Sequence, residues 1–309
     1  MSKKKSCRTT PHGADRVFVI VNSALLVLIF AITLYPLIFV ISASFSDPTA
    51  VASGQMVLLP VKPSLKAYTF VLRYKDIWVG YANTIFYTVV GTAVNLVVTI
   101  PCAYALSRRD CPFRGIIMTL FMITMYFSGG LIPGYLNMRS LGLLNSRWAL
   151  VIGGAISTYN MIIARTFFSN TIPWELHEAA FLDGCSDFKL LTKIIIPLSS
   201  PIIVVLMLYY GVAHWNSYFS ALVYITDRSK YPLQVFLREI LTIGKMAEAS
   251  FASGEVMSAE QASALLKQVD TANMIKYAVI VLASAPMMVI YPWLQKYFAK
   301  GVMIGSVKG

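Results

Sequence analysis

Six long hydrophobic runs without charged residues restrict what this chain can fold into more than any other feature. A helix needs about 20 apolar residues to cross the hydrocarbon core of a bilayer, and each run approaches or exceeds this length. We therefore expect an all-α membrane protein with six transmembrane helices. The first run is about twice as long as a signal-peptide core, so we expect it to be retained as a span. The runs are Val17–Ser44, Ile77–Leu106, Gly115–Leu136, Trp148–Ile163, Pro201–Ile225 and Tyr277–Leu294.

The overall composition agrees with a membrane protein. Hydrophobic residues make up 57% of the 309 residues and charged residues only 13%, and the mean hydropathy is +0.66. Soluble globular domains contain about 25% charged residues. The formal net charge of +12 would suggest nucleic-acid binding in a soluble chain, but many of the basic residues flank hydrophobic runs, where anionic lipid head groups lie. The composition therefore argues against a nucleic-acid-binding domain.

The Lys and Arg residues between the runs indicate an orientation, because these residues are enriched in cytoplasmic loops. A cytoplasmic amino terminus places fourteen of them inside and eleven outside, although the outside segments are longer. We therefore predict a multi-pass protein with both termini in the cytoplasm. It would comprise an amino-terminal segment 1–16, a six-span domain 17–295 and a tail 296–309. Within the domain, loop 165–198 would be cytoplasmic and segment 226–273 external.

The predicted external segment carries few signals of regular structure. We expect two short interfacial helices, at Pro232–Ile240 and Ser258–Val269, separated by Gly244 and Gly254. Such a segment would cap the entrance of a substrate path. A loose solvated loop is the alternative that its weak periodicity leaves open.

The predicted cytoplasmic loop contains signals for two short helices. Pro173 can begin the first helix, because its missing amide needs no partner and its ring presets φ, and we expect this helix to run to about Asp183. Gly184 suits the left-handed residue that ends a helix, and Ser186 can cap the second one, which we expect to reach about Lys193. The pattern predicts a helix, a sharp turn and a second helix.

This pair of helices has the features of a docking element for a soluble partner. Ala179 and Ala180 leave little bulk on one side of the first helix, so another surface could approach its backbone. Glu178 and Asp183 supply charge for a basic or amide-rich pocket. An ordinary capped, solvated loop is the alternative. The candidate docking residues are Glu178, Ala179, Ala180, Asp183, Gly184 and Pro197, the last of which we expect to open the next span.

The spacing of Glu-Ala-Ala at 178–180, Asp-Gly at 183–184 and Ile-Pro at 196–197 resembles the EAA motif of the membrane subunits of binding-protein-dependent ABC importers. Three more stretches are similar to the carbohydrate-uptake branch of that family, the group around the maltose importer. They are Asn-Thr at 83–84, HWNSY at 214–218 and KGVMIGSVKG at 300–309. The resemblance covers the chain from about Gln55 to its end.

The resemblance implies a fold, a location and a set of partners. The fold would be that of a type I ABC importer permease with six transmembrane helices, located in the bacterial cytoplasmic membrane. The partners would be a second, related permease subunit, two cytoplasmic ATPase subunits and an extracytoplasmic solute-binding protein. ATP and Mg would be used by the ATPase, and the tail 300–309 would reach toward it. The substrate would be a sugar, and the ending and the long outer segment favour an oligosaccharide or polysaccharide fragment.

The same resemblance implies roles for the loop residues. Glu178 would make a charge contact with the ATPase, and Ala179 and Ala180 would pack closely against it. Asp183 would be a cap or second polar contact, and Gly184 would form the turn. We therefore expect the loop to contain a coupling helix.

Aromatic and amide side chains within the spans suit the apolar faces and hydroxyl groups of a sugar, although most such residues must serve packing or interfacial anchoring. In the resembling family the fifth span lines the translocation path. In the maltose-type importer the other membrane subunit holds most of the sugar, so contacts from this chain would be weak or absent. The candidate substrate-path residues are Tyr126, Asn160, Tyr210, Trp215, Asn216 and Tyr218.

Catalytic and metal-binding motifs are missing from the sequence. It contains no Walker loop, no H-E-x-x-H, no G-x-S-x-G and no paired cysteine spacing, so we expect a non-enzymatic chain without a cofactor or metal of its own. The six runs also offer no carboxylate for a proton- or sodium-driven carrier. The alternatives left open are a permease subunit for a non-sugar solute and a non-transporting membrane sensor or assembly protein.

Overall fold

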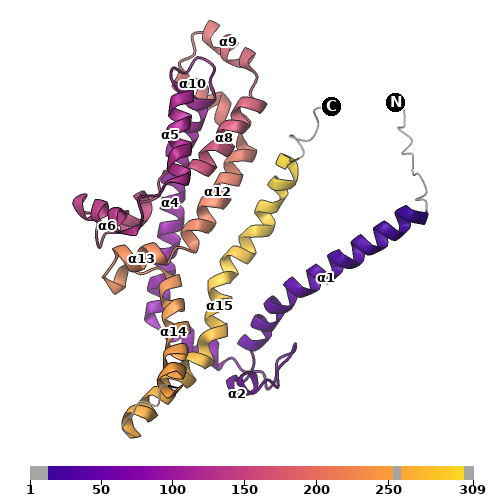
Figure 1. Cartoon of the computed structure of the whole chain (residues 1–309), viewed down its shortest axis with the longest axis vertical. Coiled ribbons are helices and arrows are strands. Elements are labelled where there is room, and N and C mark those ends of the chain that lie inside the picture. Colours follow the sequence, from indigo (N-terminus) through magenta and orange to yellow (C-terminus); the bar gives the residue numbers. More distant parts are fainter. Residues whose placement is uncertain (1–12, 253–258, 303–309) are drawn as a thin grey trace.

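The computed structural model of the chain describes residues 13–252 and 259–302, and within these residues it contains helices and no strand. Figure 1 shows their arrangement. The helices are α1 (Gly13–Ser44), α2 (Pro48–Ala52), α3 (Lys66–Arg73), α4 (Lys75–Ser107), α5 (Arg114–Tyr126), α6 (Leu131–Ser140), α7 (Arg147–Ile152), α8 (Thr158–Thr171), α9 (Trp174–Leu182), α10 (Asp187–Leu190), the π-helix η1 (Leu191–Ile195), α11 (Ile196–Leu198), α12 (Ser200–Trp215), α13 (Phe219–Tyr224), the 3-10 helix η2 (Arg228–Lys230), α14 (Leu233–Ala252) and α15 (Ala259–Val302).

Three of the predicted spans are uninterrupted helices. α1, α4 and the part of α15 from 271 to 292 are each long and apolar enough to cross a membrane. Two bent pairs of helices bring the number to five among the described residues if each pair counts as one span: α5 with α6, bent by 116°, and the helix 187–198 with α12, bent by 84°. The all-α fold is confirmed, and the middle spans are less regular than predicted.

The predicted third, fourth and fifth spans are each broken into two helices. The run Gly115–Leu136 breaks between α5 and α6, and Trp148–Ile163 breaks between α7 and α8. Each break contains paired glycines, at 129–130 and 153–154, and glycine disfavours a helix interior. The run Pro201–Ile225 breaks between α12 and α13, where the Ser217 hydroxyl donates to the His214 carbonyl at 2.8 Å and competes with helix continuation.

Polar residues of α4 bond backbone groups of the chain packed around it. The Asn83 amide donates to the carbonyls of Ser229 and Tyr231 at 2.8 and 3.0 Å, and the Thr84 hydroxyl accepts from the Leu233 amide at 2.8 Å. Both side chains are buried. Because a backbone group inside a membrane protein needs a partner, these α4 side chains stabilise the irregular segment between α13 and α14.

The segment predicted to be an external cap forms two long helices packed against each other. α14 runs to Ala252 and includes Gly244, so it is longer than the predicted helix Pro232–Ile240. From Ala259 on, the predicted helix Ser258–Val269 is the beginning of α15, which continues into the sixth span because no glycine or proline interrupts it before Pro286. The loose-loop alternative is thus excluded for the described part, while Gly254 lies outside it.

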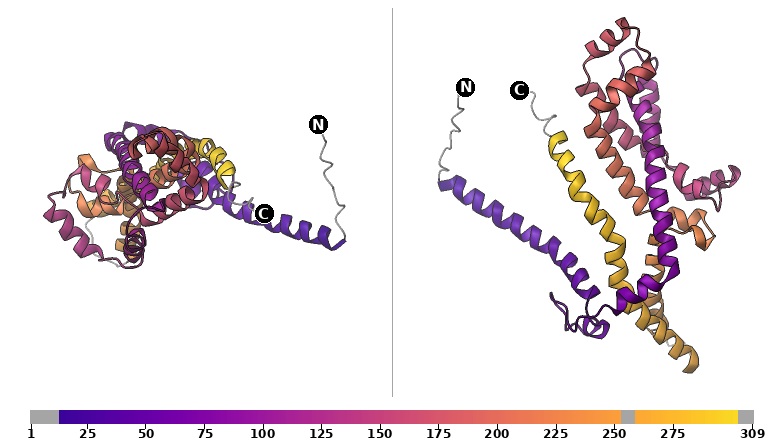
Figure 2. Two further views of the ribbon diagram at one scale, coloured as in Figure 1. Left: turned by 90° about the horizontal axis from the view of Figure 1, so that it is seen from above. Right: turned by 180° about the vertical axis from the view of Figure 1, so that it is seen from behind.

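α4 is the central helix, and α8, α12 and α14 pack along it (Figure 1). One end of the molecule carries α9 and α10, and the opposite end carries α2 and α14. The first turn of α1 and the last turns of α15 point toward the end that carries α9 (Figures 1 and 2). The amino-terminal part of α1 stands away from the helical body in both views of Figure 2, and its apolar side chains are exposed.

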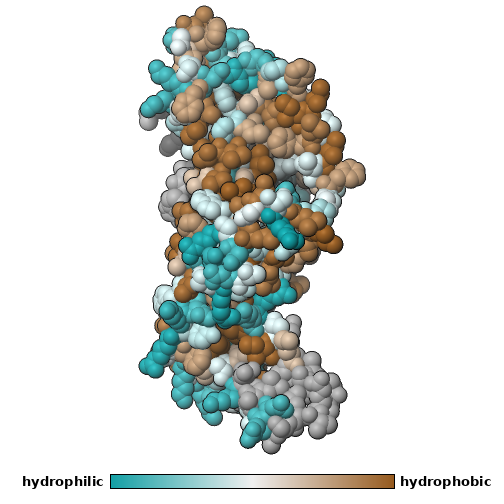
Figure 3. Space-filling model, turned by 90° about the vertical axis from the view of Figure 1, so that its left-hand side faces the viewer, coloured by the Kyte–Doolittle hydropathy of each residue, from teal (hydrophilic) through white to brown (hydrophobic). Residues whose placement is uncertain are grey.

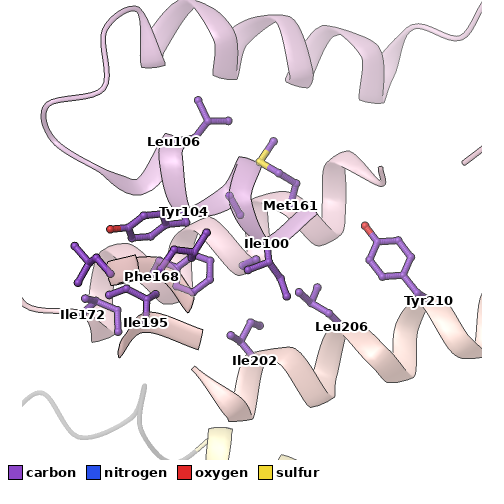
Figure 4. Close-up of a cluster of buried hydrophobic side chains, with 14 of the residues drawn as sticks. Ile100, Tyr104, Leu106, Met161, Phe168, Ile172, Ile195, Ile202, Leu206 and Tyr210 are labelled. Atoms are coloured by element: carbon purple, nitrogen blue, oxygen red, sulfur yellow. The ribbon is translucent and has the colours of Figure 1, made fainter. Parts of the chain in front are cut away.

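A buried cluster near the α9 end joins the broken helices into one unit. Tyr104 of α4, Phe168 of α8 and Ile195 of η1 face one another, and Leu206 of α12 continues the cluster toward the middle of the molecule (Figure 4). Figure 3 shows a broad band of hydrophobic residues on one face, with hydrophilic residues gathered above and below it. This distribution fits a chain whose middle lies in hydrocarbon and whose ends lie in water.

Candidate functional site

The docking loop has the helix, turn and helix that its sequence predicts. α9 follows Pro173 and ends one residue earlier than expected, and Gly184 adopts a φ of +69°. The Gly184 amide donates to the Phe181 carbonyl at 3.0 Å and the Cys185 amide to the Ala180 carbonyl at 2.9 Å, which is the bond pair of a Schellman helix end. The Ser186 hydroxyl caps α10 by accepting from the Lys189 amide at 3.4 Å.

The second half of the loop differs from the prediction. The helix that begins at Asp187 does not stop near Lys193 but continues through η1 and α11 to Leu198. Pro197 therefore lies inside this helix and does not open the next span. The turn into the membrane is the 84° bend between Leu198 and Ser200.

The docking residues divide between the surface and the interior. Glu178, Ala179 and Asp183 are exposed, whereas Ala180 is buried in the cluster around Tyr104. The expectation that both alanines present a bare side to a partner is wrong for Ala180, because its small side chain packs α9 onto its own chain.

Three exposed hydrophobic side chains on this loop were missed by the sequence reasoning. Phe181 and Leu182, on the last turn of α9, are 81% and 85% exposed, and Phe188 of α10 is 77% exposed. Hydrophobic atoms are visible at this end of the molecule in Figure 3. The sequence signal that could have identified this exposed group is the presence of large apolar residues near the turn glycine of a polar loop. We call Phe181, Leu182 and Phe188 the loop knob.

Aromatic stacking and ion pairs hold the loop on the helical body. The His177 ring of α9 stacks between Trp174 and Tyr104, with ring centroids 5.1 and 5.8 Å away. The Arg108 guanidinium bonds Asp110 at 2.8 Å and also pairs with Asp187 at the start of α10. The hydrogen bond from Arg108 lowers the pKa of the Asp110 carboxyl. These contacts attach α9 and α10 to the carboxyl-terminal end of α4.

A polar pocket lies in the middle of the bundle. Its volume is about 330 Å³ and it lies between α7, α8, α12 and α13. We call it the membrane pocket. Two of the candidate path residues, Asn160 and Tyr210, line it together with Ser157, His214, Ser217 and Tyr224.

One side of the membrane pocket is fixed by Asn95 of α4. The Asn95 amide donates to the carbonyls of Gly154 and Ala155 at 2.7 and 2.9 Å, in the break between α7 and α8. Its oxygen lies 2.7 Å from Nε2 of His214, which donates to it because the Asn95 amide is already committed. The His214 ring also occupies the space beside Gly91, where a Cβ would meet it at 2.5 Å. Asn95 thus ties α4, the α7–α8 break and α12 together.

The other four predicted path residues lie outside the membrane pocket. Trp215 is buried and its indole donates to the Ala283 carbonyl of α15 at 3.0 Å, so it packs two helices together. The Asn216 amide donates to the Val212 carbonyl at 2.9 Å and ends α12. Tyr126 is exposed at the end of α5, and Tyr218 lies in a separate groove beside α14.

The comparisons with known proteins all indicate the same protein family. Residues 77–304 match the family described as binding-protein-dependent transport system inner membrane component. The chain is 41% identical over 295 residues to the polygalacturonan/rhamnogalacturonan transport system permease protein of Bacillus subtilis, which covers 96% of this chain and 99% of that protein. It is 40% identical over 296 residues to protein LplC of the same organism, with 96% of each chain covered.

A solved structure supports the same conclusion. The fold is similar to a chain from the crystal structure of a bacterial ABC transporter involved in the import of the acidic polysaccharide alginate, with a TM-score of 0.81 and 38% identity. The similarity covers 94% of this chain and 99% of that one. The chain therefore belongs to the family of inner membrane components, the permease subunits, of binding-protein-dependent ABC importers.

Proposed function

We propose that this chain is one half of the translocation path of an ATP-driven importer for an acidic oligosaccharide. The observation that carries the proposal is the full-length similarity to a polygalacturonan/rhamnogalacturonan permease and to an alginate importer, two proteins named for acidic polysaccharides. A second, related permease subunit would complete the path, and an extracytoplasmic solute-binding protein would deliver the sugar. The location would be the bacterial cytoplasmic membrane.

In this proposal α9 is the coupling helix that docks into a separate ATPase subunit. The chain carries no Walker loop, so ATP and Mg would be bound by that partner. The loop knob supports the assignment, because exposed hydrophobic patches rimmed by polar residues mark interaction surfaces. Phe181, Leu182 and Phe188 would fill an apolar cleft, and the neighbouring Glu178 and Asp183 would meet its polar rim.

The orientation follows from the position of α9. An ATPase works in the cytoplasm, and the first turn of α1 and the last turns of α15 point toward the α9 end (Figure 1). Both termini would therefore be cytoplasmic, and the packed pair α14 and α15 would face outward. The predicted contact of the tail with the ATPase concerns mainly residues 303–309, which lie outside the described residues.

The membrane pocket would provide this chain's part of the sugar path. Asn160 supplies an amide and Tyr210 a ring, the groups that suit sugar hydroxyls and ring faces. The Tyr210 hydroxyl is already bonded to the Thr99 hydroxyl at 2.7 Å and accepts from the Ser157 amide at 3.1 Å. A volume of about 330 Å³ would accommodate part of an oligosaccharide. The second permease subunit would supply the rest of the surface.

Transport by the complete importer in proteoliposomes tests the proposal. We expect uptake of a labelled galacturonate oligosaccharide to require ATP and the solute-binding protein, and Asn160→Ala to reduce it. Uptake of an amino acid or a metal complex with no uptake of any sugar would overturn the proposal and favour the non-sugar alternative.

A further inference from the structure

A second groove lies beside the membrane pocket, where the break between α12 and α13 meets α14. Its volume is about 510 Å³ and we call it the arginine groove. Arg238 of α14 lies over the ring of Tyr218, with 4.9 Å between its guanidinium carbon and the ring centroid. Both side chains are exposed, Tyr218 by 38%, so a ligand in the groove can reach them. The lining residues are Tyr218, Gln234, Leu237, Arg238, Leu241 and Thr242.

Arg238 carries a charge that no carboxylate neutralises, whereas the nearby cations are paired. Arg228 bonds Asp76 and Glu239 at 2.9 and 3.0 Å, and Lys230 bonds Asp227 at 3.3 Å. Among the described residues Arg238 forms no ion pair, and the arginine groove is lined by no Asp or Glu. The groove therefore presents one unneutralised positive charge.

The position of the Arg238 guanidinium over the Tyr218 ring leaves its N–H groups available to a ligand. A guanidinium that lies over an aromatic ring uses its flat face, and its N–H groups point outward in the plane. Two of these N–H groups match the two oxygens of a carboxylate. The amide of Gln234 and the hydroxyl of Thr242 lie in the same lining and can bond sugar hydroxyls, while Leu237 and Leu241 offer an apolar wall.

The arginine groove adjoins the path proposed above. Ser217 and Ser220, on either side of Tyr218 in the chain, line the membrane pocket. α14 extends toward the end of the molecule opposite α9 (Figure 1). With α9 at the cytoplasmic end, the arginine groove lies on the outer side of the membrane pocket, where an incoming substrate passes first.

We propose that Arg238, Tyr218 and Gln234 form a subsite for the carboxylate of a uronate unit, at the outer side of the path. This inference rests on the proposed function for its placement in a transport path. It adds a chemical basis for selecting acidic over neutral sugars within this subunit. Arg238 binds the carboxylate, Tyr218 positions the guanidinium, and Gln234 bonds a neighbouring hydroxyl.

The test compares trigalacturonate with its trimethyl ester, which has the same rings but no charge because all three carboxylates are esterified. The purified complex of both permease subunits and the ATPase subunits is titrated with each sugar. The solute-binding protein is left out. We expect the wild type to prefer the free acid by about tenfold or more, as removal of a charge-assisted hydrogen bond predicts. Arg238→Gln should abolish the preference, and Arg238→Lys should retain part of it. Tyr218→Leu should weaken it.

Arg139→Gln is the matched control, because Arg139 is also an exposed arginine with no ion pair among the described residues and lines neither groove. It should keep the wild-type preference. An unchanged preference in Arg238→Gln, or an equal loss in Arg139→Gln, would overturn the subsite. If the importer carries sugars but the wild type binds acid and ester equally, the subsite is wrong and the importer function stands. If binding depends on Arg238 but no sugar is transported, the subsite stands and the importer function is wrong.

Discussion

Asn95 shows how a single buried amide can hold a broken membrane helix in place. It satisfies two carbonyls in the break between α7 and α8 and also accepts from His214. A break in a membrane helix leaves backbone carbonyls without helical partners, and this amide supplies partners for two of them. One residue thereby fixes the geometry of the pocket that Asn160 and Tyr210 line.

Asn95→Ala should destabilise the folded protein strongly. Loss of the amide leaves the carbonyls of Gly154 and Ala155 without this partner, at a cost of about 1–3 kcal/mol for each group that finds no new one. We expect the midpoint of thermal unfolding in detergent to fall by several degrees. Asn216→Ala is the control, since the exposed Asn216 makes one local bond to Val212 and should unfold like the wild type. Equal midpoints for both variants would contradict the role given to Asn95.

The left-handed backbone conformation at position 184 favours glycine, while the space around this residue is open. Its φ is +69°, and a Cβ added there would meet no atom within 4 Å. Gly184→Ala should therefore cost about 1–2 kcal/mol of local strain without a clash, and it should distort the end of α9. We expect ATP-driven uptake to fall several-fold while the importer still assembles, and Gly184→Asn to be milder.

Gly54 provides a control for this prediction. It has a φ of +72° with open space around it, but it lies near α2, at the end opposite α9. Gly54→Ala introduces the same kind of strain away from the coupling loop. Uptake should stay close to that of the wild type, and a loss as large as that of Gly184→Ala would point to general destabilisation.

Among the elements, α9 combines a buried side and an exposed side within nine residues. Ala180 and His177 attach it to the body, while Phe181 and Leu182 point away from it. An element built in this way suits the proposed coupling role, because its inner side is fixed by stacking and packing and its outer side is exposed to a partner.

Leu182→Ser should impair docking without harming the fold. The side chain is 85% exposed, so its loss removes little buried area from this chain. We expect less ATPase subunit to co-purify with the permease, and ATP-driven uptake to fall by about tenfold, the size of a modest interface contact. Leu59→Ser, at a position 77% exposed near α2, should change neither measurement. Unaltered ATPase recovery with Leu182→Ser would exclude the loop knob from the interface.

The elements also show what the sequence could predict. Long apolar runs identified α1, α4 and the membrane part of α15, and Pro173, Gly184 and Ser186 located the docking loop closely, because caps and turns are local signals. The breaks inside the middle spans were missed. The break between α7 and α8 depends on Asn95 of α4, which lies far away in the sequence and bonds the backbone carbonyls of the break.

The membrane pocket was less predictable from the sequence. Residue type alone could not separate Asn160 and Tyr210, which line this pocket, from Trp215, whose indole joins α12 to α15. The loop knob was missed because exposure cannot be deduced from a short helix that has small and large residues on several sides.

The whole molecule has two different ends, and this asymmetry makes its orientation testable. One end carries α9 with the loop knob, and the other carries α2 and α14. The proposed docking of α9 to an ATPase would place this end in the cytoplasm, and the bias of Lys and Arg residues predicts the same side. The substrate would then enter beside α14 and leave toward α9.

Cysteine labelling in intact cells tests this orientation directly. In a variant whose four native cysteines are replaced, Glu178→Cys and Lys62→Cys introduce thiols at the two ends. A maleimide that cannot cross the membrane should label position 62 in intact cells, and position 178 only after the cells are opened, because a bilayer separates the two positions. The same variants labelled after solubilisation in detergent control for the reactivity of each thiol. Labelling of position 178 from outside would reverse the topology and remove the coupling role of α9 with it.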